Sequence, residues 1–505
     1  MRKRLICSIG RRAARSTPSG PVKPRSRASC SSCRVVCSAS RSAQPSVGTR
    51  STIRPARSPV RATHGGASTS GITAGSSKTW EAFGEINVPL LKDLPFVHEL
   101  SLSAAGRVTN VTSTRTSDGF SDSDNGNWTY KLGGNWAPTE WFRVRGSYGT
   151  SFRSPALFEQ FLANETSFQF SRNIDPCAGY TNGFLTGRIN QRQRDNCIAQ
   201  GIPATYNGSG VSATVSSQGG IGQLEAETSK AFVIGGVLTP RLGFLGSRTR
   251  INIAVDYFDI KVSGQVAQLG AASIIFGCYD SASFPTDPLC SLFTRGQTGA
   301  PFNINTVSDQ YINIASQQNS GVDLTANVRS DLGAWGNISF TADMTWQTRD
   351  TFQLLPTSPI QTDNGEAGSP RWVGDFRLTW NLPSSGTTLF YGMNVIGATS
   401  NVDEFLADNN GNPCINGDRG DGVAIRGIYC PVLTTNATFY HNASITQEVA
   451  DKFEITLGVS NLFNTRPPRV SVLNGGQISM LGPVVAASQY SFVGRRAFIN
   501  VSAKF

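Results

Sequence analysis

The sequence predicts an all-β protein, an antiparallel transmembrane β-barrel, and three observations carry this prediction. The chain ends in mid-strand on an aromatic residue, its body is a run of amphipathic strands, and the connections between those strands are short and long in turn. Its 505 residues include 52 Gly and 28 Phe, and only 16% are charged, which is typical of β-structure with many turns. No stretch of 18 or more apolar residues is present, so the sequence excludes a spanning helix.

The last eight residues, 498–505, read as the final strand of a barrel. One face carries Ile499, Val501, Ala503 and Phe505, and the other carries Asn500, Ser502 and Lys504. A barrel must close its final strand against another strand, and a terminal aromatic suits the interfacial girdle of such barrels. We therefore expect Phe505 to mark the closure and assembly terminus.

The net charge of +11 belongs to the N-terminal segment. Residues 1–64 hold 13 Arg, 2 Lys and no acidic residue, which leaves 30 basic against 34 acidic residues for the rest of the chain. The charge therefore gives no reason to expect nucleic-acid binding.

Residues 1–75 are rich in Arg, Ser and Pro and lack hydrophobic periodicity, so we expect a disordered segment. The opening resembles a signal peptide, but its apolar stretch breaks at Arg11. A mistranslated start in a GC-rich gene explains this composition best; a genuine disordered extension or a basic arm for anionic partners is the alternative. Three cysteines between residues 30 and 37 are spaced like a metal or cluster site, but no fold is expected around them.

From residue 76 onward, apolar and polar residues alternate in segments of about 10–14 residues, longer than the strands of soluble sheets. A large soluble β-sandwich or propeller is the alternative. Arg, Asp and Asn on the polar faces suit a water-filled lumen instead, and tryptophans collect near strand ends, where a membrane boundary would hold them. These tryptophans are Trp335, Trp346, Trp372 and Trp380.

The expected connections fall into two sets. The short turns lie near residues 91–97, 137–140, 239–248, 331–334, 382–385 and 449–452. The long loops lie near residues 114–124, 152–225, 262–316, 350–369, 399–434 and 466–488. Short periplasmic turns and long extracellular loops are typical of outer-membrane barrels, and these boundaries give about 13 strands.

Six cysteines follow residue 75, and each pair falls inside one expected long loop. The pairs are Cys177 with Cys197, Cys278 with Cys290, and Cys414 with Cys430. In an oxidising compartment we expect disulfides, each stabilising its loop by about 3 kcal/mol in the chain-entropy model. Unpaired thiols are the main alternative, because a metal site needs clustered Cys or His and the chain has only three His.

Two segments resemble motifs of the barrel of TonB-dependent outer-membrane receptors. Residues 148–160 are similar to the family's strand-to-loop motif and depart from it at Gln160; residues 458–468 are similar to an element near the barrel's end, with Asn464 where the family usually has Asp. Residues 319–323 and 495–505 resemble two further strands of the family. The matching residues are Tyr148, Phe152, Arg153, Pro155 and Glu159 in the first motif, and Asn461, Leu462, Phe463 and Pro467 in the second.

These motif residues have a structural interpretation that we favour over ligand binding. Asn461 and Asn464 precede two prolines, so the strand must stop there and turn. Arg153 precedes Pro155 and could anchor the base of a loop by pairing with a strand carboxylate.

The resemblance implies a 22-stranded barrel around an N-terminal plug, and a short motif that pairs with the energy-coupling protein TonB by strand addition. Residues 1–75 cannot supply such a plug. We therefore expect residues 76–505 to be the C-terminal part of the barrel, about 13–14 of its strands, and the chain alone to be inactive because an unclosed sheet leaves backbone groups unpaired in lipid.

The intact parent is expected to lie in the outer membrane of a Gram-negative bacterium. The barrel-assembly machinery, membrane lipid and TonB would be its partners, and its solute would be a ferric siderophore or a carbohydrate, bound in part by loop aromatics such as Phe168, Phe170 and Tyr180. A passive porin and an adhesin or autotransporter translocator are the alternative functions.

Nothing in the sequence indicates catalysis, a resident cofactor or a metal. Walker A, dinucleotide and G-x-S-x-G motifs are missing, and His441 has no acid or nucleophile near it in sequence. The acidic stretch after Asp408 has Pro413 where a calcium-binding EF-hand needs Gly, which favours a solvated loop.

Overall fold

The computed structural model describes residues 51–53, 71–185, 188–241, 248–355, 360–409, 411–416, 427–450, 452–472, 483–485 and 489–503. The predictions for the N-terminal cysteines, the signal-like opening and Phe505 lie outside these residues. Two described strands start before residue 76, at Ser51 and Thr73, so strand structure extends slightly further toward the N-terminus than the expected boundary.

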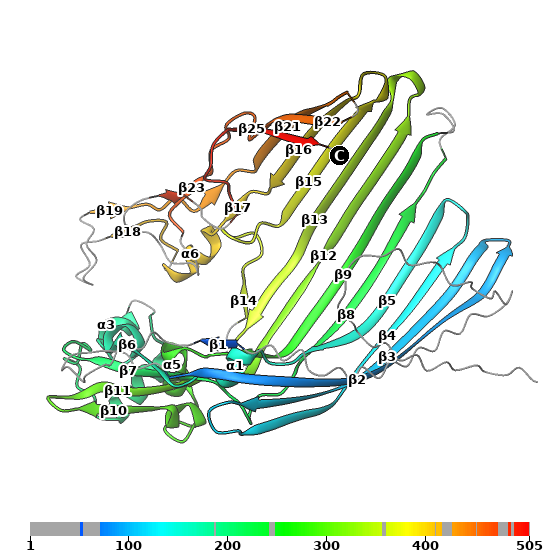
Figure 1. Cartoon of the computed structure of the whole chain (residues 1–505). Coiled ribbons are helices and arrows are strands. Elements are labelled where there is room, and N and C mark those ends of the chain that lie inside the picture. Colours follow the sequence, from blue (N-terminus) through cyan, green and yellow to red (C-terminus); the bar gives the residue numbers. More distant parts are fainter. Residues whose placement is uncertain are drawn as a thin grey trace, which may run out of the picture.

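One large antiparallel sheet dominates the molecule (Figure 1). Its long strands are β2 (Thr73–Leu94), β3 (Val97–Arg115), β4 (Ser121–Ala137), β5 (Phe142–Arg153), β8 (Glu227–Leu238), β9 (Arg250–Ala267), β12 (Ile312–Asp331), β13 (Asn337–Gln353), β15 (Trp372–Leu382), β16 (Thr387–Ile396), β21 (Thr438–Val449), β22 (Phe453–Ser460) and β25 (Arg496–Ala503). Short strands β1 (Ser51–Ile53) and β14 (Gln361–Thr362) pair with β2 and β13. The all-β class and the expected number of strands are confirmed. Among the described residues, β25 pairs with β22 alone, so the two edges of the sheet do not meet.

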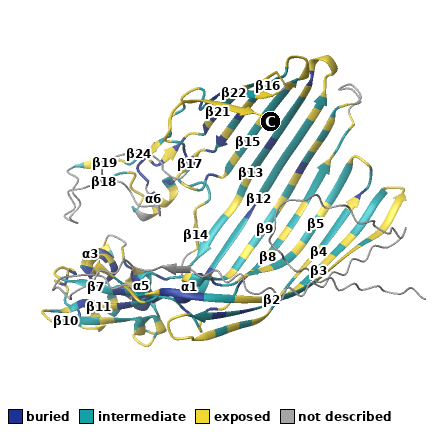
Figure 2. Cartoon of the chain, viewed as in Figure 1, coloured by how far each residue is buried: buried dark blue, intermediate teal, exposed yellow. Residues whose placement is uncertain are grey.

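The strand register sorts side chains onto two continuous faces. Phe340, Leu378 and Tyr391 lie side by side across β13, β15 and β16, and the same face carries apolar residues on the other long strands. One residue further along, Thr341, Arg377 and Gly392 form a rung of the opposite, polar face. Large side chains of the apolar face stay exposed, as at Trp128, which is 72% exposed. Exposed and intermediate positions accordingly alternate along the strands in Figure 2. An apolar outer face and a polar inner face are what a membrane barrel requires.

Tryptophans mark both ends of the apolar face. Trp346 and Trp372 are register partners, and Trp380 lies eight residues beyond Trp372, where its indole Nε1 donates to the carbonyl of Trp335 over 2.8 Å. Eight residues of strand span about 26 Å, close to the ~25 Å height of the apolar band of outer-membrane barrels. The four tryptophans therefore lie where the sequence predicts a membrane boundary.

The connections alternate as expected, with one exception. Five of the six short turns are present, and most of the sixth, near residues 239–248, lies outside the described residues. The predicted long loop at residues 114–124 is instead a turn of residues 116–120 between β3 and β4. Its polar residues continue the strands, because Thr114 and Ser121 share a cross-strand hydroxyl hydrogen bond of 2.7 Å and Thr112 pairs with Ser123 over 3.0 Å. Several strands are longer than the expected 10–14 residues, and β2 reaches 22.

Helices and small sheets occupy the long loops. The helices are α1 (Leu157–Phe161), α2 (Ser171–Ile174), α3 (Tyr180–Leu185), α4 (Gln191–Ala199), α5 (Ala271–Asp280) and α6 (Val402–Asp408), with the 3-10 turn η2 (Pro288–Leu292). Two further 3-10 turns, η3 (Gly333–Trp335) and η4 (Pro383–Ser385), lie in short turns. The loop strands are β6 (Glu165–Phe170), β7 (Ser212–Gln218), β10 (Phe293–Gln297), β11 (Ala300–Gln310), β17 (Thr399–Ser400), β18 (Ile415–Asn416), β19 (Ile428–Tyr429), β20 (Thr434–Thr435), β23 (Arg469–Val470) and β24 (Val484–Val485). Within the described part of the chain, none of the helices combines the length and apolar character needed to cross a bilayer.

Candidate functional site: the loop assemblies and the polar face

Two long connections, residues 154–226 and 268–311, fold together into one unit, which we call the loop module. Its sheet has the order β10-β11-β7-β6, and the parallel pairing of β11 with β7 joins one connection to the other. Figure 1 shows the module at the end of the large sheet opposite the short turns. Each connection therefore depends on the other for its structure.

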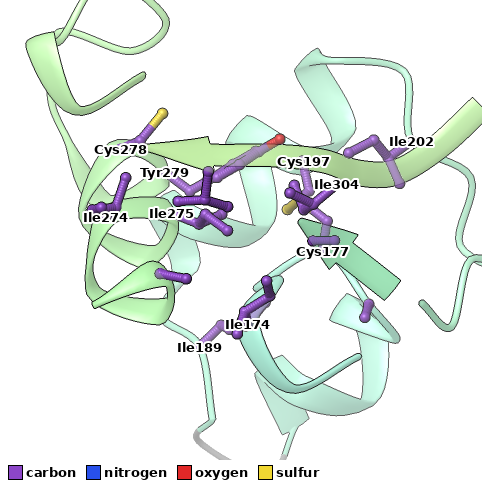
Figure 3. Close-up of a cluster of buried hydrophobic side chains, with 14 of the residues drawn as sticks. Ile174, Cys177, Ile189, Cys197, Ile202, Ile274, Ile275, Cys278, Tyr279 and Ile304 are labelled. Atoms are coloured by element: carbon purple, nitrogen blue, oxygen red, sulfur yellow. A yellow bond between two sulfur atoms is a disulfide. The ribbon is translucent and has the colours of Figure 1, made fainter. Parts of the chain in front are cut away.

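The loop module has its own hydrophobic core (Figure 3). Helix α5 supplies Ala271, Ile274, Ile275, Cys278 and Tyr279, whose spacing of i, i+3, i+4, i+7 and i+8 places them on one helix face. Ile304 and Val307 of β11 are fully buried against the same core. The alternation rule that identifies strands cannot detect this helix; its signal is the helical spacing of apolar residues within the expected loop.

The six cysteines form the three expected pairs. Cys177–Cys197 and Cys278–Cys290 lie in the loop module, and Cys414–Cys430 lies in a second assembly described below. Cys177, Cys197 and Cys278 are fully buried in the core. The disulfides thus join covalently those loop segments that also pack together.

A buried ion pair ties the two connections of the loop module together. Arg295 Nη1 and Nη2 donate to the two carboxylate oxygens of Asp175 over 2.7 and 2.9 Å, although the residues are 120 positions apart. The Asp175 side chain is fully buried and that of Arg295 is 10% exposed. Tyr206 Oη donates to Asp175 over 2.8 Å, and Arg295 Nη2 donates to Tyr279 Oη over 2.9 Å. Each of the four side chains therefore has a hydrogen-bond partner inside the core, and of the Arg295 guanidinium only the buried Nε has none.

Electrostatics in this buried cluster follow from desolvation and from the ion pair. Burial lowers the pKa of Arg295, but its hydrogen bonds and attraction to Asp175 outweigh burial and leave the pKa raised. Burial raises the pKa of Tyr279 to about 12, so this tyrosine stays neutral at physiological pH. The cluster has a structural role, because it joins the two connections of the loop module.

Arg153 anchors the base of the loop module, the role that the sequence suggests for it. Its guanidinium pairs with Glu227 of β8, at 2.5 and 2.7 Å, and with Glu159 of α1, at 3.0 Å for both contacts. Glu227 also accepts from the backbone N–H of Val266 on β9 over 2.7 Å. One arginine therefore joins the ends of three strands to the first loop helix.

The rest of the first motif is structural as well. Glu159 accepts from the N–H of Ala156 over 2.6 Å, and Gln160, which departs from the family pattern, donates to the carbonyl of Pro155 over 2.6 Å. Tyr148 and Phe152 belong to β5, where the Tyr148 ring lies on the apolar face 6.2 Å from the ring of Tyr130.

The second motif ends β22 and leads the chain back to β25. Asn461 is buried, has a φ of 53°, and holds the turn by hydrogen bonds with both the N–H and the carbonyl of Thr465. Asn464, which replaces the usual Asp, accepts from the N–H of Arg495 over 3.0 Å. The N–H of Leu462 donates to the carbonyl of His441, and the exposed Phe463 packs edge-on against the His441 ring. Pro467 follows as a half-buried residue of the turn.

A second loop assembly is formed by the described residues of 354–371, 397–437 and 461–495. Its small core contains Phe405, Ile415, Leu433 and Val472. Beside the core, Asn401 Nδ2 donates to Glu366 over 2.9 Å and to Glu404 over 3.1 Å, so two carboxylates approach the same amide. Burial, followed by repulsion from Glu404, raises the pKa of Glu366 to about 7.

This raised pKa predicts a pH-dependent second loop assembly. Because the pKa of Glu366 is higher in the fold than its ordinary value of 4.5, its stabilising contribution is complete below pH 4.5 and is lost as the pH rises through 7. We expect the substitution Glu366→Gln to make the assembly more stable at pH 8 by about 1 kcal/mol, after discounting for solvent exposure, and to leave it unchanged at pH 4.5. The measurement is the rate of proteolysis in residues 360–409 for both proteins at each pH. An equal effect of the substitution at both pH values would contradict the prediction.

Charged residues of the polar face pair across strands. Arg145 on β5 donates to both oxygens of Asp256 on β9, over 2.8 and 2.5 Å, and so bridges the intervening strand β8. The register places Gly235 between them, where an added Cβ would lie 2.0 Å from Asp256 Oδ1. Only glycine leaves room for this bridge. Arg377 likewise pairs with Asp375 and with Asp343 of the neighbouring strand.

The sequence therefore predicts some of these site residues and misses others. Cysteines, Arg153 and the turn asparagines carry visible sequence signals, whereas Asp175 and Arg295 do not. The suggestion that Tyr180 stacks on a ligand is wrong, because Tyr180 is buried and its hydroxyl donates to the carbonyl of Ile202. Phe168 and Phe170 are exposed on β6, as a ligand contact would require. No group of three or more His, Cys, Asp or Glu in the described ranges is placed to hold a metal ion.

The two-faced sheet, with short turns at one end and disulfide-bonded loops at the other, defines an outer-membrane β-barrel protein. A family profile described as "TonB dependent receptor-like, beta-barrel" matches residues 44–462. The chain therefore belongs to the TonB-dependent receptor family. Proteins of this family lie in the outer membrane of Gram-negative bacteria, and they are transporters, not enzymes.

The solved structures that the chain matches include siderophore receptors. A variant of the ferric enterobactin receptor of Pseudomonas aeruginosa, in complex with enterobactin, is 13% identical with a TM-score of 0.46, over 86% of this chain and 55% of that chain. The siderophore receptor PirA of Acinetobacter baumannii is 11% identical with a TM-score of 0.45, over 86% and 56%. The chain thus spans just over half the length of these receptors. A search of the curated proteins found no match.

Proposed function

We propose that the intact protein imports a scarce, bulky solute across the outer membrane with energy supplied through TonB. The observation that supports this function best is the combination of a polar inner face with large, rigid loop assemblies at one mouth of the sheet. A passive porin does not need such loops to capture a dilute solute. The solute class is a ferric siderophore or an oligosaccharide.

The loop module suits capture of such a solute. Its core, two disulfides and the Arg295–Asp175 pair fix its surface before binding, which lowers the entropic cost of binding. Strand β6 presents Phe168 and Phe170, and the guanidinium of Arg172 lies 5.6 Å from the ring of Phe170. Exposed aromatic faces stack on sugar rings and on catecholates alike, so this surface supports both solute classes.

We expect the described sheet alone not to transport. Among the described residues the two ends of the sheet, β1 with β2 on one side and β25 on the other, do not pair with each other, and edges left unpaired in lipid cost several kcal/mol per backbone group. Further strands are needed to surround a lumen.

The test is uptake by a Gram-negative host that lacks its own receptors for the probes and expresses the intact gene. Labelled ferric siderophores and labelled oligosaccharides are supplied at nanomolar concentration, with and without functional TonB. Uptake of one class that needs TonB supports the proposal. Uptake of small solutes regardless of TonB would identify a passive channel and overturn it. Expression of residues 71–505 alone is expected to give no uptake.

A further inference from the structure

Two arginines face each other at the short-turn mouth of the polar face. Arg250, the first residue of β9, and Arg329, near the end of β12, are register partners. Both lie on the polar face, since the apolar residues Ile251 and Val328 take the other side. Residues directly opposite in an antiparallel pair have Cβ atoms about 4.5–5.5 Å apart, so two positive charges are held together here.

Neither arginine has an acidic partner among the described residues. The nearest acids pair with other arginines, because Asp331 pairs with Arg248 over 3.1 Å and Glu140, which lies at the same mouth, is 3.8 Å from Arg241. The next residue across the sheet from Arg329 is Ser339, which is neutral. Residues 242–247 of the adjoining turn contain no acid in the sequence. Like charges directly opposite each other are destabilising, so this arginine pair does not stabilise the fold.

The next rung of the polar face completes a set of hydrogen-bond donors. Asn252 and Asn327 are register partners two residues further into the sheet. Thr341 Oγ1 donates to Asn327 Oδ1 over 3.2 Å, which fixes the amide and leaves its Nδ2 as a donor. These four side chains border an open cavity of about 800 Å³, together with Trp141 and the Glu140–Arg241 ion pair, whose charges offset each other.

We propose that this cavity is a binding site for a phosphate group, held between Arg250 and Arg329. Planar guanidinium groups match phosphate oxygens in bidentate geometry, and a tetrahedral anion can receive both guanidinium groups and an asparagine amide at once. A carboxylate has only two oxygens and cannot satisfy the same donors. The site lies at the mouth opposite the loop assemblies and is independent of the solute proposed above. The phosphate is either inorganic phosphate or part of a free phosphate ester, because the polar face lines the lumen and does not meet lipid.

The experiment is calorimetric titration of the full chain, refolded in a zwitterionic detergent, with inorganic phosphate, glycerol 3-phosphate and acetate. We expect phosphate to bind and acetate to bind at least tenfold more weakly. Tighter binding of inorganic phosphate indicates the free anion as the ligand, and tighter binding of glycerol 3-phosphate indicates an organic phosphate ester. Absence of phosphate binding at millimolar concentration, or equal affinity for acetate, would overturn the site.

Three variants make the test specific. Arg329→Gln is expected to weaken phosphate binding at least tenfold. Arg248→Gln removes the same charge from the same mouth but not from the facing pair, so we expect less than a twofold change. Arg329→Glu places an acid opposite Arg250; it is expected to abolish binding while it retains the β-sheet circular dichroism of the parent. If Arg248→Gln and Arg329→Gln lose the same phosphate affinity, the binding depends only on the total positive charge of this mouth, and the proposal is refuted.

Discussion

Replacement of Arg295 with methionine is expected to destabilise the loop module by about 3–5 kcal/mol, because it leaves the fully buried Asp175 carboxylate without its cation. The tyrosine hydroxyl and backbone donors around Asp175 cannot neutralise its charge. The hydrogen-bond partners described for this ion pair, Tyr206, Tyr279 and the backbone of Cys177 and Phe302, all belong to the loop module, so the large sheet should keep its structure. The loop module should therefore open while the rest of the protein stays folded.

Limited proteolysis with mass spectrometry measures this local opening. In Arg295→Met, cleavage within residues 154–226 and 268–311 is expected to accelerate at least a hundredfold, as the loss of about 3 kcal/mol implies. The matched control is Arg172→Met, which removes an exposed arginine of the same module and should change little. The double variant Arg295→Met with Asp175→Leu should recover much of the resistance, since no unpaired buried charge remains. If Arg295→Met resists the protease as well as the parent, the ion pair does not hold the module together.

The disulfides could be predicted from the sequence and the Arg295–Asp175 ion pair could not, because the disulfides join residues of one loop and the ion pair joins two loops. Cysteine is rare in the body of this chain, and its pairs are 12, 16 and 20 residues apart within single loops, so a local rule finds them. Asp175 and Arg295 belong to different loops, and their contact depends on β5, β8, β9 and β12 lying side by side in register. Only the folded sheet determines that distance. The same holds for the bridge from Arg145 to Asp256 over Gly235.

Local rules also explain where strand and loop predictions succeed or fail. Alternation over ten or more residues is a strong signal, and it locates the long strands and their short turns. At residues 114–124 the alternating residues are Ser, Thr and Asp, which resemble a loop by composition, but their hydroxyl groups pair across strands and extend β3 and β4. Helix α5 shows the reverse case. Its apolar residues have helical spacing in the sequence, but the segment is predicted only to be a long loop, so the helix is missed.

The assignment of the two faces predicts a large difference between neighbouring positions of β15. Leu378 lies on the apolar face between Phe340 and Tyr391, and Thr379 lies on the polar face between Ser339 and Phe390. An arginine on the lipid face costs about 2–4 kcal/mol at the membrane midplane and about 0–1 kcal/mol near the interfaces, whereas lumen positions tolerate charge. Leu378 lies between the midplane and the boundary at Trp380, so we expect Leu378→Arg to destabilise the folded protein by about 2 kcal/mol and Thr379→Arg by less than about 1 kcal/mol.

The free energy of folding of the full chain into phosphatidylcholine vesicles, from urea titration followed by tryptophan fluorescence, measures both variants. Leu378→Ala separates lost packing from the cost of the charge, because it shortens the same side chain without adding one. A soluble sheet would reverse the expectation for this strand, since an exposed outer face accepts arginine freely and a packed inner face does not. Equal costs at residues 378 and 379, or a greater cost at Thr379, would therefore show that the apolar face does not meet lipid and would remove the physical basis for placing this sheet in a membrane.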